Sequence, residues 1–263
     1  MRLRRVTTLY MRIDQLLVQR GLASTRSQAQ RLIAAGVRWQ AEGAWRQVAK
    51  NGDDVAPDAV LELLDDAEAR FVSRGGLKLD AALKRLGLAV TGLRCLDVGQ
   101  STGGFTDCLL RRGAAHVLGI DVGSGQLHQQ LRCDTRVTCL EGVNARYLGA
   151  DDLPDGAEEF SLVVGDLSFI SQTLVLPALR PCLSEGGSLL MLVKPQFELQ
   201  PGQVGKGGIV TDDALYSVVE RRIRAAHEAL GLSVQAYFQS AIDGGDGNRE
   251  FFVHSIRQPE CTP

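Results

Sequence analysis

Residues 93–107 read LRCLDVGQSTGGFTD, in which a short apolar strand enters a glycine-rich turn that opens a helix. In α/β proteins this arrangement lets the backbone approach a ligand at the carboxyl edge of a parallel sheet. The spacing is not Gly-x-Gly-x-x-Gly, and no third glycine follows to pack against a pyrophosphate, so the dinucleotide fingerprint is not matched. The turn therefore predicts an α/β fold with a different small molecule bound beside it.

Two acidic residues mark the ends of consecutive strands. Asp97 begins the turn, and Asp121 lies near the end of the next apolar run. The pair suits a cofactor with an amino group and a ribose diol, because Asp121 can accept hydrogen bonds from both ribose hydroxyls. The alternative is that both carboxylates only cap helix starts.

The chain beyond residue 72 alternates apolar runs with helical stretches, which predicts a mostly parallel sheet covered on both faces. The apolar runs expected as strands are Cys95–Val98, Val117–Val122, Leu162–Val164, Leu189–Val193, Val234–Phe238 and Phe251–Ile256. A further strand end is expected at Leu140–Arg146. We divide the chain into a tail at 1–10, a small domain at 11–64, a linker at 65–72 and a large domain at 73–263.

The first fifth of the chain, which includes the tail and most of the small domain, is basic although the whole chain carries a formal charge of −2. Through Lys50, ten Lys and Arg residues stand against Asp14 and Glu42, which leaves a net charge of +8. Such a local charge suits a polyanion, since each phosphate contacted by Lys or Arg releases counterions. A basic solvated face without a ligand is the alternative.

The apolar spacing in this domain predicts two short helices on either side of Gly21–Thr25, with Ser24 or Thr25 capping the second. That helix ends at Gly36, and a hairpin follows with its turn at Glu42-Gly43. The pattern MRIDQLLVQRGLASTRSQAQRLIAAGV resembles the S-four RNA-binding domain, a small α+β module that reads RNA by shape. A basic protein-docking helix pair is the alternative. The residues expected to meet RNA are Arg12, Arg26, Ser27, Arg31 and Lys50.

Four segments of the large domain place ionisable residues at strand ends or turns. Asp166 and Lys194 follow the apolar runs SLVV and LLMLV, so both are expected at the carboxyl edge of the sheet. Lys78 lies in SRGGLKL, and Glu250 lies in GNREF. A charge at a buried strand end is costly without a partner, which favours a functional site, although any one of the four alone would suit a surface salt bridge.

The segment DVGQSTGGFTD resembles the signature of FtsJ-related methyltransferases, in which alanine is commoner than Gln100. The resemblance implies a Rossmann-like class I methyltransferase fold with a mostly parallel seven-stranded sheet, S-adenosylmethionine as cofactor, and Asn144 near the adenine. The residues then expected to bind the cofactor are Asp97, Gly99, Gln100, Ser101, Gly103, Gly104, Phe105, Asp121, Asn144 and Asp166.

Methyl transfer to a ribose needs alignment and the removal of one proton. A lysine can assist when burial or a neighbouring cation lowers its pKa from about 10.4. We therefore expect Lys194 to deprotonate or polarise the hydroxyl, with Asp166 and Glu250 holding it and balancing its charge. Lys78 is expected to contact the target ribose or phosphate and to act on Lys194 through its charge.

The order Lys78, Asp166, Lys194, Glu250 resembles the tetrad of FtsJ-type 2'-O-methyltransferases. With GKGGIV at Gly205–Val210, the chain from Met11 onward is similar to the TlyA family, whose members are called hemolysins or ribosomal RNA methyltransferases. This resemblance implies 2'-O-methylation of cytidine in 16S or 23S ribosomal RNA, with ribosomal RNA or subunits as partner. Lys206 is expected to touch RNA from a flexible loop.

Three other functions are weighed against this one. A non-catalytic ribosome-assembly factor would not need all four tetrad residues, and a methyltransferase for small molecules or proteins would not explain the basic domain. A pore-forming hemolysin is disfavoured because no signal peptide or spanning segment is visible, which also predicts a cytoplasmic protein without membrane contact. The four histidines and six cysteines lack ligand spacing, so no metal and no disulfide is expected. For the oligomeric state, a monomer is favoured.

Overall fold

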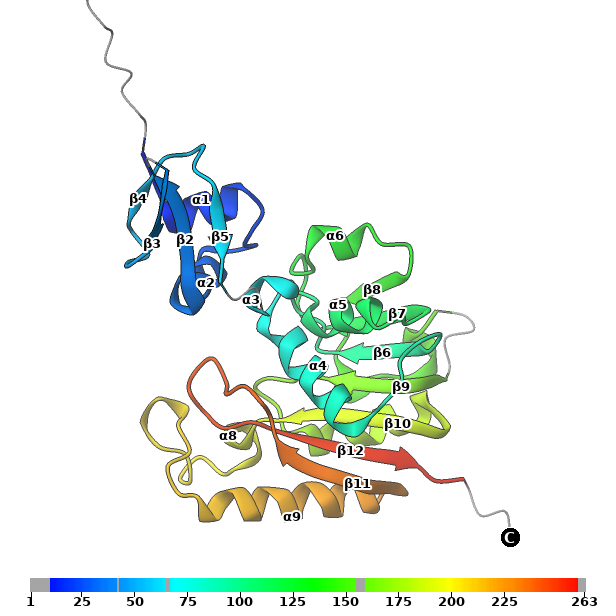
Figure 1. The fold of residues 1–263 in the computed structure, drawn as a ribbon. Coiled ribbons are helices and arrows are strands. Elements are labelled where there is room, and N and C mark those ends of the chain that lie inside the picture. The colour runs from blue at the N-terminus through cyan, green and yellow to red at the C-terminus, as the bar shows by residue number, and fades with distance from the viewer. Residues whose placement is uncertain (1–9, 42, 65–66, 155–158, 260–263) are drawn as a thin grey trace, which may run out of the picture. The chain divides into compact units, whose positions relative to one another are not determined.

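The computed structural model of the chain describes residues 10–41, 43–64, 67–154 and 159–259, and it divides into two compact units, Met1–Arg74 and Gly75–Pro263 (Figure 1). Each unit has a hydrophobic core of its own. Residues 1–9 of the expected tail, Glu42 of the expected turn and Cys261 lie outside the described residues.

Two helices form the core of the first unit. α1 spans Ile13–Gln19 and α2 spans Arg26–Gly36, as the apolar spacing predicted. The Thr25 side chain accepts a hydrogen bond from the backbone N–H of Gln28, which confirms the expected N-cap. Apolar side chains from both helices are buried together with Val37 and Val55.

Short strands complete the first unit. β1 (Met11–Arg12) pairs with β4 (Asp54–Val55), and β2 (Val37–Ala41) pairs on one side with β3 (Ala44–Gln47) and on the other with β5 (Leu61–Leu63). All these pairs are antiparallel. The β2–β3 pair is the expected hairpin. A four-residue helix, α3 (Ala67–Arg70), follows β5.

The second unit is built on a seven-stranded sheet, which confirms the expected Rossmann-like methyltransferase fold. The strand order is β11-β12-β10-β9-β6-β7-β8, and only β12 runs antiparallel to its neighbours. The strands are β6 (Arg94–Val98), β7 (His116–Asp121), β8 (Val137–Glu141), β9 (Phe160–Gly165), β10 (Leu183–Val193), β11 (Leu232–Gln239) and β12 (Phe251–Arg257).

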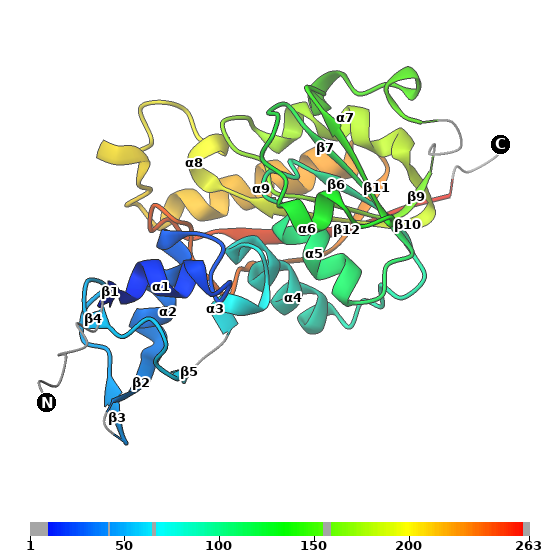
Figure 2. The same ribbon diagram turned by 90° about the horizontal axis from the view of Figure 1, so that it is seen from above.

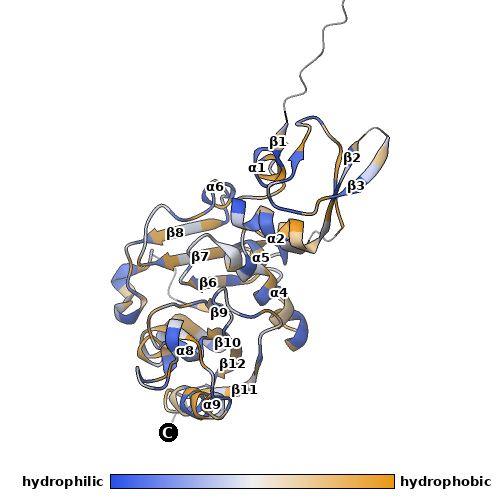
Figure 3. Cartoon of the chain, turned by 90° about the vertical axis from the view of Figure 1, so that its left-hand side faces the viewer, coloured by the Kyte–Doolittle hydropathy of each residue, from blue (hydrophilic) through white to orange (hydrophobic). Residues whose placement is uncertain are grey.

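Helices cover both faces of this sheet. Figure 2 shows α4 (Arg74–Leu86) and α5 (Gly104–Arg111) on one face, with α7 (Leu176–Leu179) and α9 (Ala214–Glu228) on the other. α9 carries both apolar and polar residues (Figure 3), because its inner face joins the core and its outer face meets solvent. The shorter helices are α6 (Gln129–Arg132) and α8 (Pro195–Glu198).

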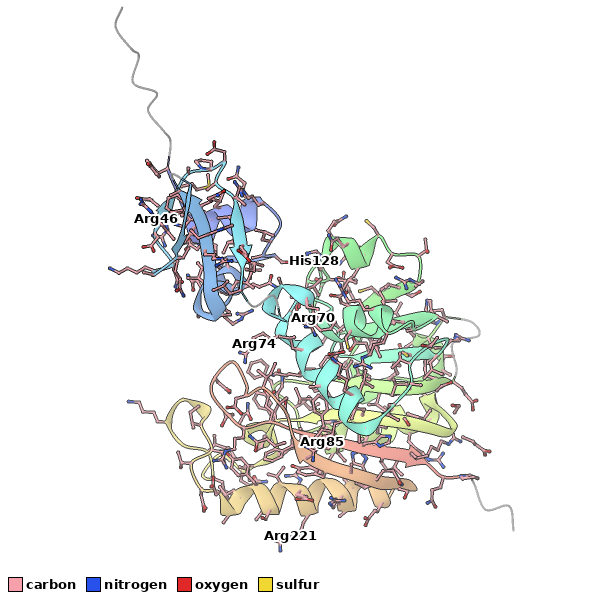
Figure 4. The ribbon with its side chains drawn as sticks, viewed as in Figure 1. Arg46, Arg70, Arg74, Arg85, His128 and Arg221 are labelled. Atoms are coloured by element: carbon pink, nitrogen blue, oxygen red, sulfur yellow. The ribbon has the colours of Figure 1, made fainter. Side chains whose placement is uncertain are left out.

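The first helix of the large unit is fixed to the antiparallel end of the sheet. Arg85 of α4, labelled in Figure 4, lies with its guanidinium carbon 4.3 Å from the ring centroid of Phe238 in β11. Lys78 lies about two turns earlier on the same helix, and its side chain is buried, with 8% exposed. No helix in the described part of the chain combines the length and apolar content needed to span a membrane.

Candidate active site

The glycine turn after β6 brings two strand ends together. Gly99 has a φ of 81°, and a side-chain carbon built on it would lie 2.8 Å from the backbone oxygen of Asp166. Any larger residue would therefore push the turn away from the segment that follows β9. The sequence LDVGQ forms this close approach at the carboxyl edge of the parallel strands, where ligands bind in open α/β sheets.

Asp121 fixes the conformation of the turn from the neighbouring strand. Its carboxylate accepts hydrogen bonds from the backbone N–H groups of Ser101 and Gly123, both at 2.7 Å. Ser101 has a φ of 46°, in the left-handed region that non-glycine residues rarely adopt. The bond from its N–H to Asp121 compensates for that strain and ties β7 to the turn.

A cavity of about 370 Å³ opens beside this turn. Its size falls in the range of small-ligand pockets, and its wall combines apolar and polar groups. Five of the residues expected to bind the cofactor line it, namely Gly99, Ser101, Asp121, Asn144 and Asp166. Its other described lining residues were not singled out from the sequence, and they are Ile120, Val122, Gly123, Gln126, Val143, Ala145, Leu167, Ser168, Phe169, Ile170 and Val175.

The other expected cofactor residues form the wall behind the turn. Asp97 and Gln100 are buried, and each is joined to Thr106, whose hydroxyl donates to Asp97 at 2.7 Å and accepts from the Gln100 amide at 2.9 Å. Gly103 precedes α5, and Gly104 and Phe105 begin that helix and are buried. Burial raises the pKa of Asp97 to about 7, the bond from Thr106 opposes this rise, and the charge of Asp166 adds to it.

Gln100, which stands where alanine is commoner in the family, occupies space that Gly119 leaves free. A side-chain carbon on Gly119 would lie 2.0 Å from the Gln100 amide carbon. The substitution is therefore accommodated inside the protein, and the glutamine side chain does not line the cavity among the described residues.

Lys194 and Asp166 form an ion pair at the edge of the cavity. Lys194 follows β10 and Asp166 follows β9, and these strands are parallel neighbours. The Lys194 Nζ lies 2.6 Å from Asp166 Oδ1 and also donates to Ser168 Oγ at 2.9 Å. The two side chains are 13% and 25% exposed, so the pair remains open to a ligand.

Lys78 and Glu250 form a second ion pair, and this one is closed to solvent. Lys78 Nζ lies 2.5 Å from Glu250 Oε2, and the side chains are 8% and 4% exposed. Burial raises the pKa of Glu250, whereas the charges of Lys78 and Lys194 lower it and that of Asp166 raises it. The four expected catalytic residues are therefore close enough to interact, and Glu250 pairs with Lys78 while Asp166 pairs with Lys194.

Glu198, which no sequence motif indicated, connects the segment after Lys194 with the loop that follows Asp166. Its carboxylate is buried and accepts from Ser171 Oγ at 2.5 Å and from the backbone N–H of Gln172 at 2.8 Å. Burial raises the pKa of Glu198, and both hydrogen bonds lower it. Its position four residues after Lys194 in KPQFE was the available signal.

Asn248 has a similar supporting role on the other side. Its buried side chain accepts from the backbone N–H of Val210 and donates to the carbonyl of Gly208, each at 2.9 Å. It thereby anchors the loop that carries Lys206, whose side chain is exposed. Because Asn248 lies two residues before Glu250, one segment supports both the closed ion pair and this basic loop.

The basic residues of the first unit include an arginine pair organised by one carboxylate. Asp14 is fully buried and lies 3.0 Å from Arg12 Nη2 and 2.8 Å from Arg26 Nη2. The hydrogen bond from Arg12 is the largest of the effects that hold the pKa of Asp14 below its usual range. The arginine side chains remain 46% and 55% exposed, and Ser27 and Lys50 are also exposed, whereas Arg31 is half-buried.

Metal-ligating side chains do not gather at either site. Within the described residues, no group of three or more His, Cys, Asp or Glu side chains is arranged to hold a metal ion.

Comparisons with known proteins identify the family of each unit. The family model of FtsJ-like methyltransferases matches residues 71–257, and that of the S4 domain matches residues 11–36. The 16S/23S rRNA (cytidine-2'-O)-methyltransferase TlyA of Mycobacterium tuberculosis is 45% identical over 92% of this chain and 88% of its own length.

Two solved structures show the fold. A protein described as a hemolysin from Streptococcus thermophilus is 39% identical, with a TM-score of 0.73 over 96% of this chain and 90% of that one. A protein from Listeria monocytogenes described as an S-adenosylmethionine dependent methyltransferase has a TM-score of 0.51 at 16% identity, over 70% of this chain and 99% of that one.

Proposed function

The chain belongs to the FtsJ-like methyltransferase family and, within it, to the TlyA proteins, and from this we propose that it methylates the ribose 2'-hydroxyl of a cytidine in ribosomal RNA. S-adenosylmethionine is the proposed methyl donor. The reaction belongs to the cytoplasm, where ribosomal RNA is found. The observation that carries the proposal is the open ion pair of Lys194 and Asp166 at the edge of the cavity.

The cavity fits the proposed cofactor. Its volume suits a nucleoside-sized ligand, and the Asp121 carboxylate lies in its wall as an acceptor for ribose hydroxyls. Val122, Val143 and Ile170 supply apolar contacts for a purine ring, with Asn144 beside them. When bound, S-adenosylmethionine supplies a methyl group that is already activated for transfer.

The residues of the chain then have to position the ribose 2'-oxygen and assist the removal of its proton. Lys194 contacts two residues of the cavity wall, Asp166 and Ser168, and its amine can accept a hydrogen bond from the hydroxyl or stabilise its developing negative charge. Asp166 lines the same cavity and fixes the Lys194 amine at 2.6 Å. Lys78 and Glu250 form a buried pair whose charges neutralise each other, and this pair supports the site.

Ribosomal RNA as substrate is supported by the first unit as well as by the name of the relative. The S4 match covers residues 11–36, which include Arg12, Arg26 and Arg31 but not Lys50. We assign phosphate and ribose contacts to Arg12, Arg26, Ser27, Arg31 and Lys50, and a further contact to Lys206. The Asp14 carboxylate orients the first two arginines before RNA arrives, which reduces the entropy lost on binding.

The proposed function is tested by incubating the purified chain with labelled S-adenosylmethionine and unmodified ribosomal subunits, then mapping the label by nuclease digestion and mass spectrometry. We expect one or two 2'-O-methylcytidines. Label on a base, on protein or nowhere would contradict the proposal.

Lys50→Ala tests the RNA-contacting role of the first unit. Loss of one phosphate contact should lower the slope of log affinity against log salt by about 1, with a modest loss of affinity for rRNA. Arg221→Ala is the matched control, because this exposed cation on α9 is outside the proposed contact set (Figure 4). An unchanged slope for Lys50→Ala in filter-binding titrations would exclude Lys50 from phosphate contact.

A further inference from the structure

Ser168 contacts the amine that the proposed reaction depends on. Lys194 Nζ makes two contacts in one short loop after β9: it forms an ion pair with Asp166 Oδ1 at 2.6 Å and donates a hydrogen bond to Ser168 Oγ at 2.9 Å. The hydroxyl is exposed and lies in the cavity wall. The tetrad does not include it, and its neighbours do not make it a nucleophile.

The tetrahedral geometry of the Lys194 amine means that the contact with Ser168 affects the direction in which the amine points. An ammonium group has three N–H bonds, and a neutral amine has two N–H bonds and a lone pair, both in tetrahedral directions. When Ser168 accepts one N–H and the Asp166 carboxylate holds the nitrogen at 2.6 Å, rotation of the amine is restricted and one direction is left for the sugar oxygen. This direction carries a donor in the charged form and the lone pair in the neutral form, so either form meets the sugar oxygen along the same line.

We propose that Ser168 is a positioning residue for the reaction, which orients the Lys194 amine toward the ribose 2'-oxygen. The inference rests on the proposed function and names one more residue needed for it. Asp166 alone would hold the amine but would leave rotation about the Cε–Nζ bond and about the contact itself. The hydrogen bond to Ser168 restricts that rotation, and alignment of reacting groups accounts for much of the rate in such transfers.

The loop that carries Ser168 is held from both sides. Phe169 has a φ of 65°, and its ring centroid lies 5.2 Å from that of Phe197, which is part of α8 directly after Lys194. Glu198 of the same helix binds Ser171 and Gln172 at the end of the loop. The loop that carries Ser168 and the helix that follows Lys194 are therefore joined by these additional contacts. The contacts help to keep the Ser168 hydroxyl beside the Lys194 amine.

The test compares Ser168→Ala and Ser168→Thr with the wild-type chain on unmodified ribosomal subunits. Single-turnover methyl transfer at saturating S-adenosylmethionine should fall roughly tenfold in Ser168→Ala, as expected for one hydrogen bond to a charged group, and should return to within about threefold in Ser168→Thr, which restores the hydroxyl. Affinity for the cofactor, measured by calorimetry, and the melting temperature should stay unchanged. Ser217→Ala, an exposed serine of α9, is the matched control.

Three results would overturn the inference. Full single-turnover rate in Ser168→Ala would show that the hydroxyl has no role. A loss confined to cofactor affinity would make Ser168 a cofactor ligand, and a loss not restored by Thr would point to packing. These outcomes leave wild-type methylation intact, whereas a wild-type chain that methylates no ribose would overturn the proposed function together with this inference.

Discussion

The two lysine–carboxylate pairs of the active site have the same chemistry and different surroundings. Lys78 and Glu250 are 8% and 4% exposed, whereas Lys194 and Asp166 are 13% and 25% exposed, and Asp166 lines the cavity. A buried pair is held by mutual neutralisation, since removing one partner leaves an unpaired charge in a region of low dielectric constant. A partly exposed pair can replace one of its contacts by a contact with substrate. We therefore assign the reaction to Lys194 and Asp166, and a supporting role to Lys78 and Glu250.

Lys194→Ala gives the largest expected effect on this comparison. Loss of the group that handles the hydroxyl should lower single-turnover methyl transfer by about 10³-fold or more. Affinity for rRNA in filter binding should stay nearly unchanged, because one half-buried lysine contributes little to it. Lys84→Ala, which removes an exposed lysine of α4, is the control for loss of charge. Substantial activity in Lys194→Ala would remove this residue from the mechanism and break the distinction between the pairs.

Glu250→Ala and Asp166→Ala should separate stability from catalysis. Glu250→Ala leaves Lys78 buried without its partner, so the free energy of unfolding should fall by about 3–5 kcal/mol. Asp166→Ala should cost less stability, because both members of its pair are partly solvated, and should reduce methyl transfer more per unit of stability lost.

Urea denaturation and single-turnover rates on the same preparations provide the measurement for this pair of variants. The double variant Lys78→Met with Glu250→Leu should recover much of the lost stability, since no unpaired charge remains. Equal losses of stability in the two single variants would show that exposure does not distinguish the pairs.

Most of the fold followed from short-range sequence patterns. Apolar runs bounded by glycine and acidic residues predicted the strands near the cofactor edge, and the N-cap at Thr25 with Gly36 at the helix end predicted α2. The expectation that Glu250 holds Lys194 was wrong, because Glu250 pairs with Lys78. Lys78 and Glu250 are 172 residues apart and meet only in the folded chain, so no local pattern indicated this pairing. Ser168 and Glu198 were missed for the same reason, since their roles depend on parallel neighbours β9 and β10.

Asp97→Asn offers the smallest expected effect and extends the comparison to a third carboxylate behind the open pair. Burial raises its pKa to about 7 in the folded chain, with a contribution from Asp166, while an unfolded Asp titrates near about 4. The folded chain thus binds this proton more tightly, so the stabilising contribution is complete below about pH 4 and is lost as pH rises through about 7.

Asp97→Asn removes this titration and still offers an oxygen to Thr106. The melting temperature of the variant minus that of wild type should therefore be a few degrees larger at pH 8 than at pH 5, with both proteins measured without cofactor. A wild-type-to-variant difference that is the same at both pH values would show that Asp97 is ionised throughout and that Asp166 does not influence it.

The most direct measurement is a structure of the chain on an unmodified ribosomal subunit, trapped with a cofactor analogue that cannot transfer its methyl group. The account predicts the target ribose 2'-oxygen within about 2.6–3.2 Å of Lys194 Nζ, with Asp166 still on that amine and Lys78 still on Glu250. A 2'-oxygen bound to Lys78, with Lys194 turned away from the sugar, would contradict it.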